Sequence, residues 1–402
     1  MDISKFTKSM TGKLVTIDHP RYKHAFIPNP IPDWTVPDAL IDLCIEVGAA
    51  LGEMNGSLND LPNPDLLMRP LREREALQSS RLEGTDADPA ELVLFAKDPR
   101  DSKSASDPAN SFVEVLNYGD AMLHGYKRMS HQGLTLSLIK EMHQCLLNGV
   151  RGEDKKPGQF RNDLVGIGRP ARFIPPPAVF VPDLLDDFQK YITRPYTSAR
   201  DRMVRAFVAH YQFETIHPFF DGNGRIGRVV MSLMIHAACG HSLPWLYMSP
   251  YFERNADEYA QKLFRVSANG EWSEWVEFCL NGAIEQAKDA VDRSKLLWAI
   301  RERYVKRSSG IASPRTTRII DGFFDSPVIR VPDIQRGFGV HYNTAKNDID
   351  DLVKIGILRQ LRDTRPITYY AWEFFRVTFQ DKPRMATEEE INEEVAKNAS
   401  AP

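Results

Sequence analysis

The twelve residues from His217 to Arg228, His-Pro-Phe-Phe-Asp-Gly-Asn-Gly-Arg-Ile-Gly-Arg, restrict the fold of this chain more than any other segment. Gly222 and Gly224 can take backbone angles that are closed to other residues, so successive N–H groups can turn inward around an anion. Asn223 tolerates the left-handed conformation almost as well. Apolar residues then recur at helical spacing. The segment therefore predicts a glycine turn that opens a helix, and a helix N-terminus favours phosphate.

The polar side chains of the same segment fit chemistry on a nucleotide. Arg225 and Arg228 stand three residues apart, on neighbouring parts of one helical face, and guanidinium groups bind phosphate oxygens in pairs. Asp221 precedes the turn and is a candidate ligand for Mg²⁺, which commonly uses one or two carboxylates together with substrate phosphates. His217 has an ordinary pKa that suits the removal of a proton from a hydroxyl near neutral pH.

This segment is similar at every defining position to HPFxDGNGRxxR, the signature of the Fic family. Family members typically transfer AMP from ATP to a protein hydroxyl. The resemblance implies that His217 deprotonates a target Ser, Thr or Tyr, that Asp221 binds Mg²⁺, and that attack at the α-phosphorus releases pyrophosphate. It also implies that the loop 222–224 holds the α- and β-phosphates, with Arg225 beside them and Arg228 on the γ-phosphate.

Residues 71–84 predict a helix that ends at Gly84. Ser79 and Glu83 lie four residues apart on one face of it. By itself, Glu83 is an ordinary exposed carboxylate at a helix end. The sequence Ser79-x-x-x-Glu83-Gly84, however, is similar to the inhibitory motif [S/T]xxxE[G/N] of many Fic proteins. The resemblance implies that Glu83 pairs with Arg228, occupies the place of the γ-phosphate and inhibits the enzyme. In some relatives this glutamate instead orients a water that removes AMP, so the direction of the reaction stays open.

Residues 157–182 predict an irregular hairpin, because short apolar runs at 164–167 and 173–174 are separated by glycine and proline. The prolines 175–177 leave it as an extended stretch. The hairpin resembles the Fic flap, which aligns a target segment by strand addition in front of the catalytic histidine. An ordinary surface hairpin is the alternative.

The overall composition excludes several classes of protein. The chain has 402 residues, a formal net charge of −3 and a pI near 6.4, which give no electrostatic case for coating nucleic acid or a membrane surface. There is no apolar leader or membrane-spanning stretch, so we expect a soluble, cytoplasmic protein. The four cysteines are scattered without zinc-binding spacing, which predicts reduced packing thiols at Cys44, Cys145, Cys239 and Cys279.

The predicted fold class is mainly α, with a Fic-type helical core and a β-hairpin flap. We expect an N-terminal region over 1–110, a catalytic core over 111–305, a winged-helix-like domain over 306–380 and a disordered acidic tail over 381–402. The N-terminal region begins with a Pro-rich arm that passes into an apolar helix near 39–51. Within the core, His210 is expected to be a packing residue, and family analogy places adenine contacts in the segment 245–263.

The C-terminal pattern of three short helices and a strand pair resembles a winged helix. Residues 313–372 hold nine Lys or Arg and seven Asp or Glu, and the third predicted helix contains Asp348, Asp350 and Asp351. DNA phosphates would repel these carboxylates, so protein contact or homodimerisation is favoured at least as much as DNA binding.

Three hypotheses follow from the sequence. We favour an autoinhibited AMP transferase that uses ATP and Mg²⁺ and acts on a protein hydroxyl, including its own. The second is an enzyme that uses the same site to remove AMP or to transfer another phosphate-containing group. The third is a DNA-binding regulator whose core senses nucleotide. The intact segment 217–228 argues against the third, because a sensor does not need a base.

Overall fold

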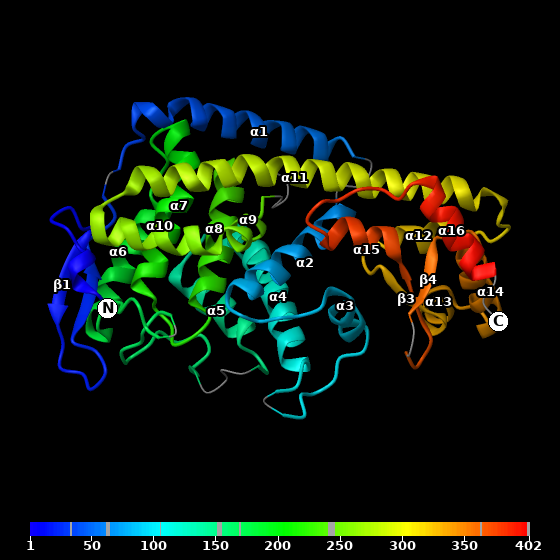
Figure 1. The fold of residues 1–402 in the computed structure, drawn as a ribbon, viewed down its shortest axis with the longest axis horizontal. Coiled ribbons are helices and arrows are strands. Elements are labelled where there is room, and N and C mark those ends of the chain that lie inside the picture. The colour runs from blue at the N-terminus through cyan, green and yellow to red at the C-terminus, as the bar shows by residue number, and fades with distance from the viewer. Residues whose placement is uncertain are drawn as a thin grey trace. The chain divides into compact units, whose positions relative to one another are not determined.

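The computed structural model is mainly helical, as the sequence predicts (Figure 1). It describes residues 1–32, 34–61, 65–104, 106–150, 155–168, 170–239, 246–361 and 364–399. The chain forms two compact units. Unit 1 comprises residues 1–56, 75–87 and 101–288, and unit 2 comprises 57–74, 88–100 and 289–402. The helices α2 (Asp65–Leu82) and α11 (Trp272–Arg307) each contribute residues to both units, and the last three residues of α1 (Ile41–Asn59) also belong to unit 2.

Unit 1 is built around helices that pack in pairs, α4 with α5, α6 with α7, and α7 with α8 (Figure 1). Its helices are α1 (Ile41–Asn59), α4 (Ala109–Gln132), α5 (Leu136–Leu146), α6 (Val181–Thr193), α7 (Ala199–Ile216), α8 (Asn223–Cys239), α9 (Ser249–Arg254) and α10 (Ala256–Asn269). The predicted turn-to-helix transition is confirmed, since α8 begins at Asn223, directly after Gly222. Ile226, Val230 and Leu233 on this helix are buried. Burial of this apolar stripe holds the polar motif at the start of α8 in place.

An antiparallel hairpin, which the sequence analysis did not predict, precedes these helices. Strand β1 (Gly12–Thr16) pairs with β2 (His24–Pro28), with Leu14 opposite Phe26. The expected Pro-rich arm thus follows a hairpin, and the expected apolar helix is α1. The Phe26 N–H donates to Ile174 O at 2.9 Å, so β2 holds the end of the candidate flap in place.

Unit 2 contains the helix and strand order expected near the C-terminus, with one additional strand. The elements are α3 (Pro89–Lys97), α12 (Thr316–Asp321), β3 (Val328–Arg330), α13 (Val331–Phe338), α14 (Tyr342–Lys354), β4 (Leu358–Leu361), β5 (Thr368–Ala371), α15 (Trp372–Phe379) and α16 (Glu388–Ala399). The strands form an antiparallel sheet in the order β3-β5-β4. On α14, Asp348 is buried, and its two oxygens accept from Arg315 at 2.7 and 3.0 Å. Among the described residues, no helix is both long and apolar enough to cross a membrane.

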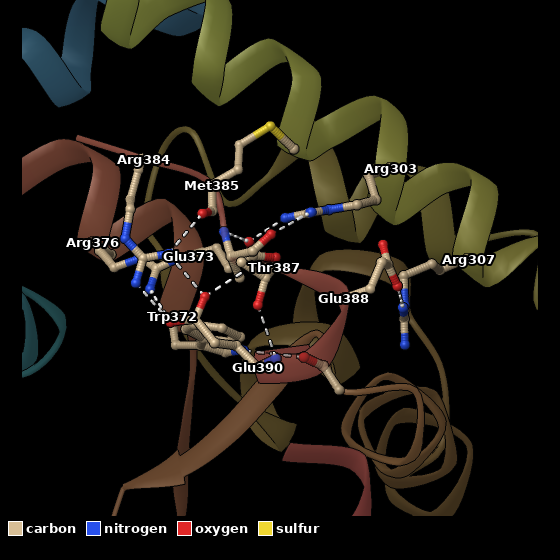
Figure 2. A network of polar contacts seen from close by, with 12 residues as sticks. Arg303, Arg307, Trp372, Glu373, Arg376, Arg384, Met385, Thr387, Glu388 and Glu390 are labelled. Atoms are coloured by element: carbon tan, nitrogen blue, oxygen red, sulfur yellow. Dashed lines mark hydrogen bonds and ion pairs between the residues drawn. The ribbon is translucent and has the colours of Figure 1, made fainter. Parts of the chain in front are cut away.

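The acidic tail differs from the expected disorder, because residues 388–399 form helix α16. Figure 2 shows Glu388 and Glu390 facing arginines of α11, α15 and the preceding loop. Glu390 pairs with Arg384 at 2.7 Å and with Arg376 at 3.3 Å, while Glu388 pairs with Arg307 at 3.2 Å. The charge run that suggested self-repulsion is thus neutralised by Arg384 within the tail and by Arg307 and Arg376, which precede it in the sequence.

An apolar contact on α16 supplies a second reason for its order. Ile391 is buried in a cluster with Trp372 and Ala386. Replacing Ile391 by alanine is expected to lower the free energy of unfolding by about 2–5 kcal/mol, the range for a buried isoleucine. The measurement is urea unfolding followed by circular dichroism. The control is Glu389→Ala on an exposed position of the same helix, which should stay within about 0.5 kcal/mol of the parent. Equal midpoints for both variants would contradict the packing of α16.

Candidate active site

The loop between α7 and α8 is shaped by two residues in the left-handed region. His217 ends α7 with φ of +51°, and Gly222 has φ of +72°. Asn223 does not take this conformation, contrary to the tolerance that the sequence suggested. Its side chain instead closes the loop, with Oδ1 accepting from Phe219 N at 2.8 Å and Nδ2 donating to Phe219 O at 3.0 Å. The buried side-chain amide of Asn223 therefore holds the glycine turn in place at the start of α8.

The Arg228 side chain joins the start of α8 to the end of α2. Its guanidinium donates from Nε to Ser79 Oγ at 2.8 Å, and from Nη2 to Ser79 O at 2.9 Å and Glu83 Oε1 at 2.7 Å. Arg228 is only 1% exposed. The ion pair that the inhibitory-motif resemblance implies is therefore present, and Ser79 shares the same guanidinium.

The Glu83 carboxylate lies directly against the glycine turn. Its Oε1 occupies the space that a Cβ atom on Gly224 would need, and Arg228 Nη1 borders the same space. Burial raises the pKa of Glu83, but the charge and hydrogen bond of Arg228 outweigh this and hold the pKa below its ordinary value. Glu83 is therefore an anion at neutral pH. It lies against the glycine turn that the sequence predicts to bind an anion.

The second arginine of the motif faces two other carboxylates. Arg225 is buried, with Nη1 at 3.6 Å from Glu114 Oε2 and Nη2 at 3.7 Å from Asp221 Oδ1. Thr85, just beyond α2, donates to Glu114 Oε2 at 2.7 Å. The residues Ser79, Glu83 and Thr85 thus connect the α2 segment to both arginines of the motif, directly or through Glu114.

Asp221 is the exposed carboxylate of the loop, with a side chain that is 48% exposed. Its Oδ1 accepts from Gly222 N at 2.6 Å, which leaves Oδ2 for another partner. In the part of the chain that the structure describes, no three metal-ligating side chains gather at one place. A cation at Asp221 would therefore need further ligands from water or substrate, which fits Mg²⁺ bound with phosphates.

The His217 ring is oriented by the last turn of α7. Its Nδ1 lies 3.2 Å from Glu214 O, and a carbonyl can only accept, so Nδ1 carries the proton and Nε2 keeps its lone pair. Burial lowers the pKa of His217 to about 4, so the ring is neutral at pH 7. The nearby Glu214 carboxyl, whose pKa burial raises to about 8, is protonated at that pH. A neutral imidazole with a free Nε2 is the form that a general base requires.

A cavity of about 290 Å³ opens beside these groups. It is lined by Glu83, Glu214, His217, Gly224 and Arg228 together with apolar side chains of the hairpin and α10. The residues of the segment 245–263 that line it are Ala256, Tyr259, Ala260 and Leu263. Trp245 lies outside the described residues. His210 is a buried packing residue, as expected, with Nε2 at 2.8 Å from Tyr259 OH.

A buried carboxylate that the sequence analysis missed anchors α2. Glu75 lies one turn before Ser79 and accepts from Tyr118 OH at 2.8 Å and from Ser249 N at 3.0 Å. Ser249 Oγ also donates to it. Glu75 and Ser79 share one face of α2, and Glu83, four residues after Ser79, continues it just past the helix end at Leu82. That regular spacing is the sequence signal that was available.

The candidate flap is an irregular hairpin, as predicted. Ile167 pairs with Phe173 as an isolated antiparallel bridge. Arg169 at its tip lies outside the described residues. Within the described chain, no backbone–backbone hydrogen bond involves residues 164–166, and the Leu164 N–H donates to Asp163 Oδ1 at 2.7 Å. Backbone groups without a backbone partner are those that a further strand can pair with.

Two family models match the part of the chain that contains the candidate site. The Fic/DOC family N-terminal model matches residues 41–127, which include Ser79 and Glu83. The Fic/DOC family model matches residues 133–235, which include the segment 217–228 and the hairpin. The chain is a Fic family protein.

Several curated relatives of this Fic protein are adenylyltransferases by name. It is 31% identical over 105 residues to the protein adenylyltransferase fic-1 of Caenorhabditis elegans, covering 26% of this chain and 20% of the relative. It is 34% identical over 85 residues to a probable protein adenylyltransferase of Aquifex aeolicus, covering 21% of this chain and 25% of the relative. The chain thus spans about a fifth to a quarter of the length of these relatives.

Solved structures support the same fold. A Fic family protein from Desulfovibrio desulfuricans matches 88% of this chain and 99% of its own, with a TM-score of 0.54 at 20% identity. A fragment of Fic-1 from Caenorhabditis elegans matches 64% of this chain and 74% of its own, with a TM-score of 0.52 at 19% identity. These likenesses establish the mainly helical Fic fold.

Proposed function

We propose that this Fic protein is an autoinhibited protein adenylyltransferase, which transfers AMP from ATP to a Ser, Thr or Tyr hydroxyl of a protein, including itself. One arrangement carries the proposal. A neutral His217 and the turn at Gly224 and Arg228 border one cavity, and Glu83 lies against that turn at 2.7 Å from Arg228. Asp221 stands exposed on the same loop, between His217 and Gly224. The adenylyltransferase names of the relatives support the same activity.

The residues of the chain divide the reaction between them. The turn 222–224 and the first N–H groups of α8 hold the α- and β-phosphates, and Arg225 adds positive charge beside them. His217 Nε2 takes the proton of the target hydroxyl as its oxygen bonds to the α-phosphorus. The bond from that phosphorus to the bridging oxygen breaks, and pyrophosphate leaves. Asp221 would hold Mg²⁺, which neutralises phosphate charge when bound.

The same geometry supports autoinhibition by competition for one arginine. The γ-phosphate of ATP needs Arg228, whose Nη2 already donates to Glu83 at 2.7 Å. Glu83 also brings negative charge against Gly224, where the phosphates would lie. ATP in a productive position must therefore displace Glu83, and the cavity of about 290 Å³ lies at the small end of the range for ligand sites.

Incubation with ATP labelled at the α-phosphate tests the proposed function directly. The Glu83→Gly protein with Mg²⁺ should acquire the α-label on protein, resistant to denaturation, and should release pyrophosphate. ATP labelled at the γ-phosphate should leave no label. Label from the γ-phosphate would identify a kinase-like transfer instead, and absence of any label would remove the proposed activity.

The pH dependence of labelling follows from the state of His217. Burial lowers its pKa to about 4, so the proton-accepting form is fully present above about pH 5. Labelling by the Glu83→Gly protein should therefore be nearly constant between pH 6 and 8, measured as initial rate in buffers of equal ionic strength. A half-maximal rate near pH 6.5, the ordinary value for histidine, would show that the base is not the half-buried ring described above.

We infer that residues 316–371 of unit 2 form a winged helix that contacts protein and supports dimerisation or target recognition. The order of its helices and strands supports the fold. Protein contact is favoured over DNA because the carboxylates on α14 engage the cations around it. Asp348 accepts from Arg315, and Asp350 pairs with Lys346. Few uncommitted positive charges remain there to attract phosphate.

A further inference from the structure

Arg161 is a buried arginine, and every partner of its guanidinium among the described residues is a backbone carbonyl. It is 3% exposed and lies at the start of the flap, outside the signature segment. Nε donates to His217 O at 2.8 Å, and Nη2 donates to Ile216 O at 3.3 Å. Its backbone N–H donates to Pro218 O at 2.8 Å. Arg161 therefore contacts the three consecutive carbonyls around the candidate base.

These contacts terminate helix α7. The last carbonyls of a helix have no partner within the helix, and cationic side chains can satisfy them. The left-handed conformation of His217 turns the chain away from the helix axis and costs of order 1–3 kcal/mol unless the surroundings hold it. Arg161 supplies this support, since it binds the carbonyl of His217 and those on both sides of it.

The same guanidinium spans the two ends of the flap. Nη1 donates to Asp163 O at 2.8 Å, where the hairpin begins, and Nη2 also donates to Pro176 O, where it ends. In the described residues no ion pair joins Arg161 to a carboxylate. Burial lowers its pKa only to about 10, so it remains charged at pH 7. A buried cation without a carboxylate is costly, which argues for a role beyond packing.

We propose that Arg161 is a positioning residue that fixes the spacing between the open edge of the flap and His217. The proposal rests on the proposed function, in which a target strand pairs with residues 164–166 and presents its hydroxyl to His217 Nε2. Arg161 joins both ends of that hairpin to the backbone of the base. It therefore sets where the hydroxyl stands relative to the ring, without touching nucleotide or target.

A second side chain links the same two segments. His143 is fully buried, and its Nδ1 accepts from Gly158 N at 2.9 Å, near the start of the hairpin segment 157–182. Its Nε2 then carries the proton and donates to Asp221 O at 3.0 Å. The ring stacks on Phe219 at 3.7 Å between centroids. The start of the hairpin segment is thus held at a second point against the loop between α7 and α8.

The test compares two arginine-to-lysine changes in the Glu83→Gly protein. Arg161→Lys keeps the charge but cannot reach all these carbonyls at once. Its maximal rate of self-labelling should fall about tenfold, because a full 1 Å misplacement costs on the order of 10²-fold and lysine shifts the target hydroxyl by less than that. Half-saturating MgATP should stay within about twofold. Hydrogen exchange of backbone amides in 158–177 should also accelerate.

Arg205→Lys is the matched control. Arg205 is similarly buried in the same unit and donates to Arg194 O and to Pro195 O at 2.8 Å, after the end of α6, and unlike Arg161 it also pairs with a carboxylate, that of Asp201. It should lose thermal stability without changing the labelling rate or flap exchange. Arg161→Gln is the second variant, and it should behave like Arg161→Lys with a larger loss.

Three results would overturn the proposal. They are a labelling rate equal to the parent in Arg161→Lys, flap exchange no faster than in Arg205→Lys, and failure of both Arg161 variants to fold when Arg205→Lys folds. If the Glu83→Gly parent itself labels no protein, the proposed function fails. The exchange comparison still decides whether Arg161 positions the hairpin, because it needs neither ATP nor target.

Discussion

Replacing Glu83 by glycine should raise the initial rate of AMP transfer about 10- to 100-fold at fixed MgATP. In the proposed transfer reaction Glu83 makes no contact that catalysis needs. It occupies two things that ATP needs, the Arg228 guanidinium and the space beside Gly224. A hydrogen bond between charged groups is worth roughly 1.5–3 kcal/mol, and 1.4 kcal/mol corresponds to a factor of ten. The measurement is incorporation of α-label into protein under initial-rate conditions.

Two further variants separate charge from space. Glu83→Gln keeps the shape of the side chain but loses the ion pair, so it should reach an intermediate rate. Asp86→Gly removes an exposed carboxylate three residues later, with no bond to Arg228, and should leave the rate unchanged. ADP lacks the γ-phosphate and does not compete with Glu83 for Arg228, so its affinity should change much less than that of ATP.

A different outcome would favour AMP removal. AMP also accumulates on protein when its removal stops, so faster labelling of Glu83→Gly has two explanations. Protein preloaded with AMP distinguishes them. If the wild type clears AMP from preloaded protein and Glu83→Gly does not, Glu83 serves hydrolysis. If neither protein clears the AMP and Glu83→Gly labels faster than the wild type, Glu83 inhibits the transfer reaction. Equal labelling by both proteins would contradict autoinhibition.

The candidate site residues that could be predicted from the sequence lie close to one another in the chain, within one turn or one helix. The turn at Gly222 and the helix after it are adjacent in sequence, and Ser79 and Glu83 share a face of α2 because they stand four residues apart. The pairing of that face with Arg228 came from the family resemblance. No local pattern brings together residues separated by 145 positions.

The residues that the sequence missed act through tertiary contacts. Arg161 has no informative neighbours, and its role depends on carbonyls at 216–218 and at Pro176 that only the fold brings near. In the sequence, Glu75 is one of several carboxylates in a charged helix. Only the fold brings Tyr118 and Ser249 to it as hydrogen-bond donors. A single side chain that binds backbone carries no sequence signature.

Helix α16 illustrates the opposite error, in which a local pattern suggested too little structure. Its acidic run predicts repulsion when considered alone. Of the arginines that pair with it, Arg384 lies only six residues before Glu390, whereas those at positions 307, 359 and 376 lie outside the tail. Charge patterning therefore failed here because most of the compensating charges are remote in sequence, and Ile391 and Val395, four residues apart, were the apolar signal in the run.

Replacing His217 by alanine in the Glu83→Gly protein should reduce labelling by a factor on the order of 10² to 10⁴, the range for loss of a general base. The ring contributes a free Nε2 lone pair, since its Nδ1 proton is directed to Glu214 O at 3.2 Å. Phosphate binding should persist, because the turn at Gly222 and both arginines remain. The affinity for MgATP, measured by calorimetry, is expected to stay within about threefold of the parent.

The control is His131→Ala, which removes an exposed histidine from the end of α4 and should change neither rate nor affinity. Alanine at position 217 also loses the ring that directs its Nδ1 proton to the α7 carbonyl, so flap exchange must be compared with the parent before the rate is interpreted. With exchange and MgATP affinity preserved, the lost rate belongs to proton transfer from the target hydroxyl. Labelling at the parent rate under those conditions would mean that another group takes the proton, and the neutral ring of His217 would have no part in the reaction.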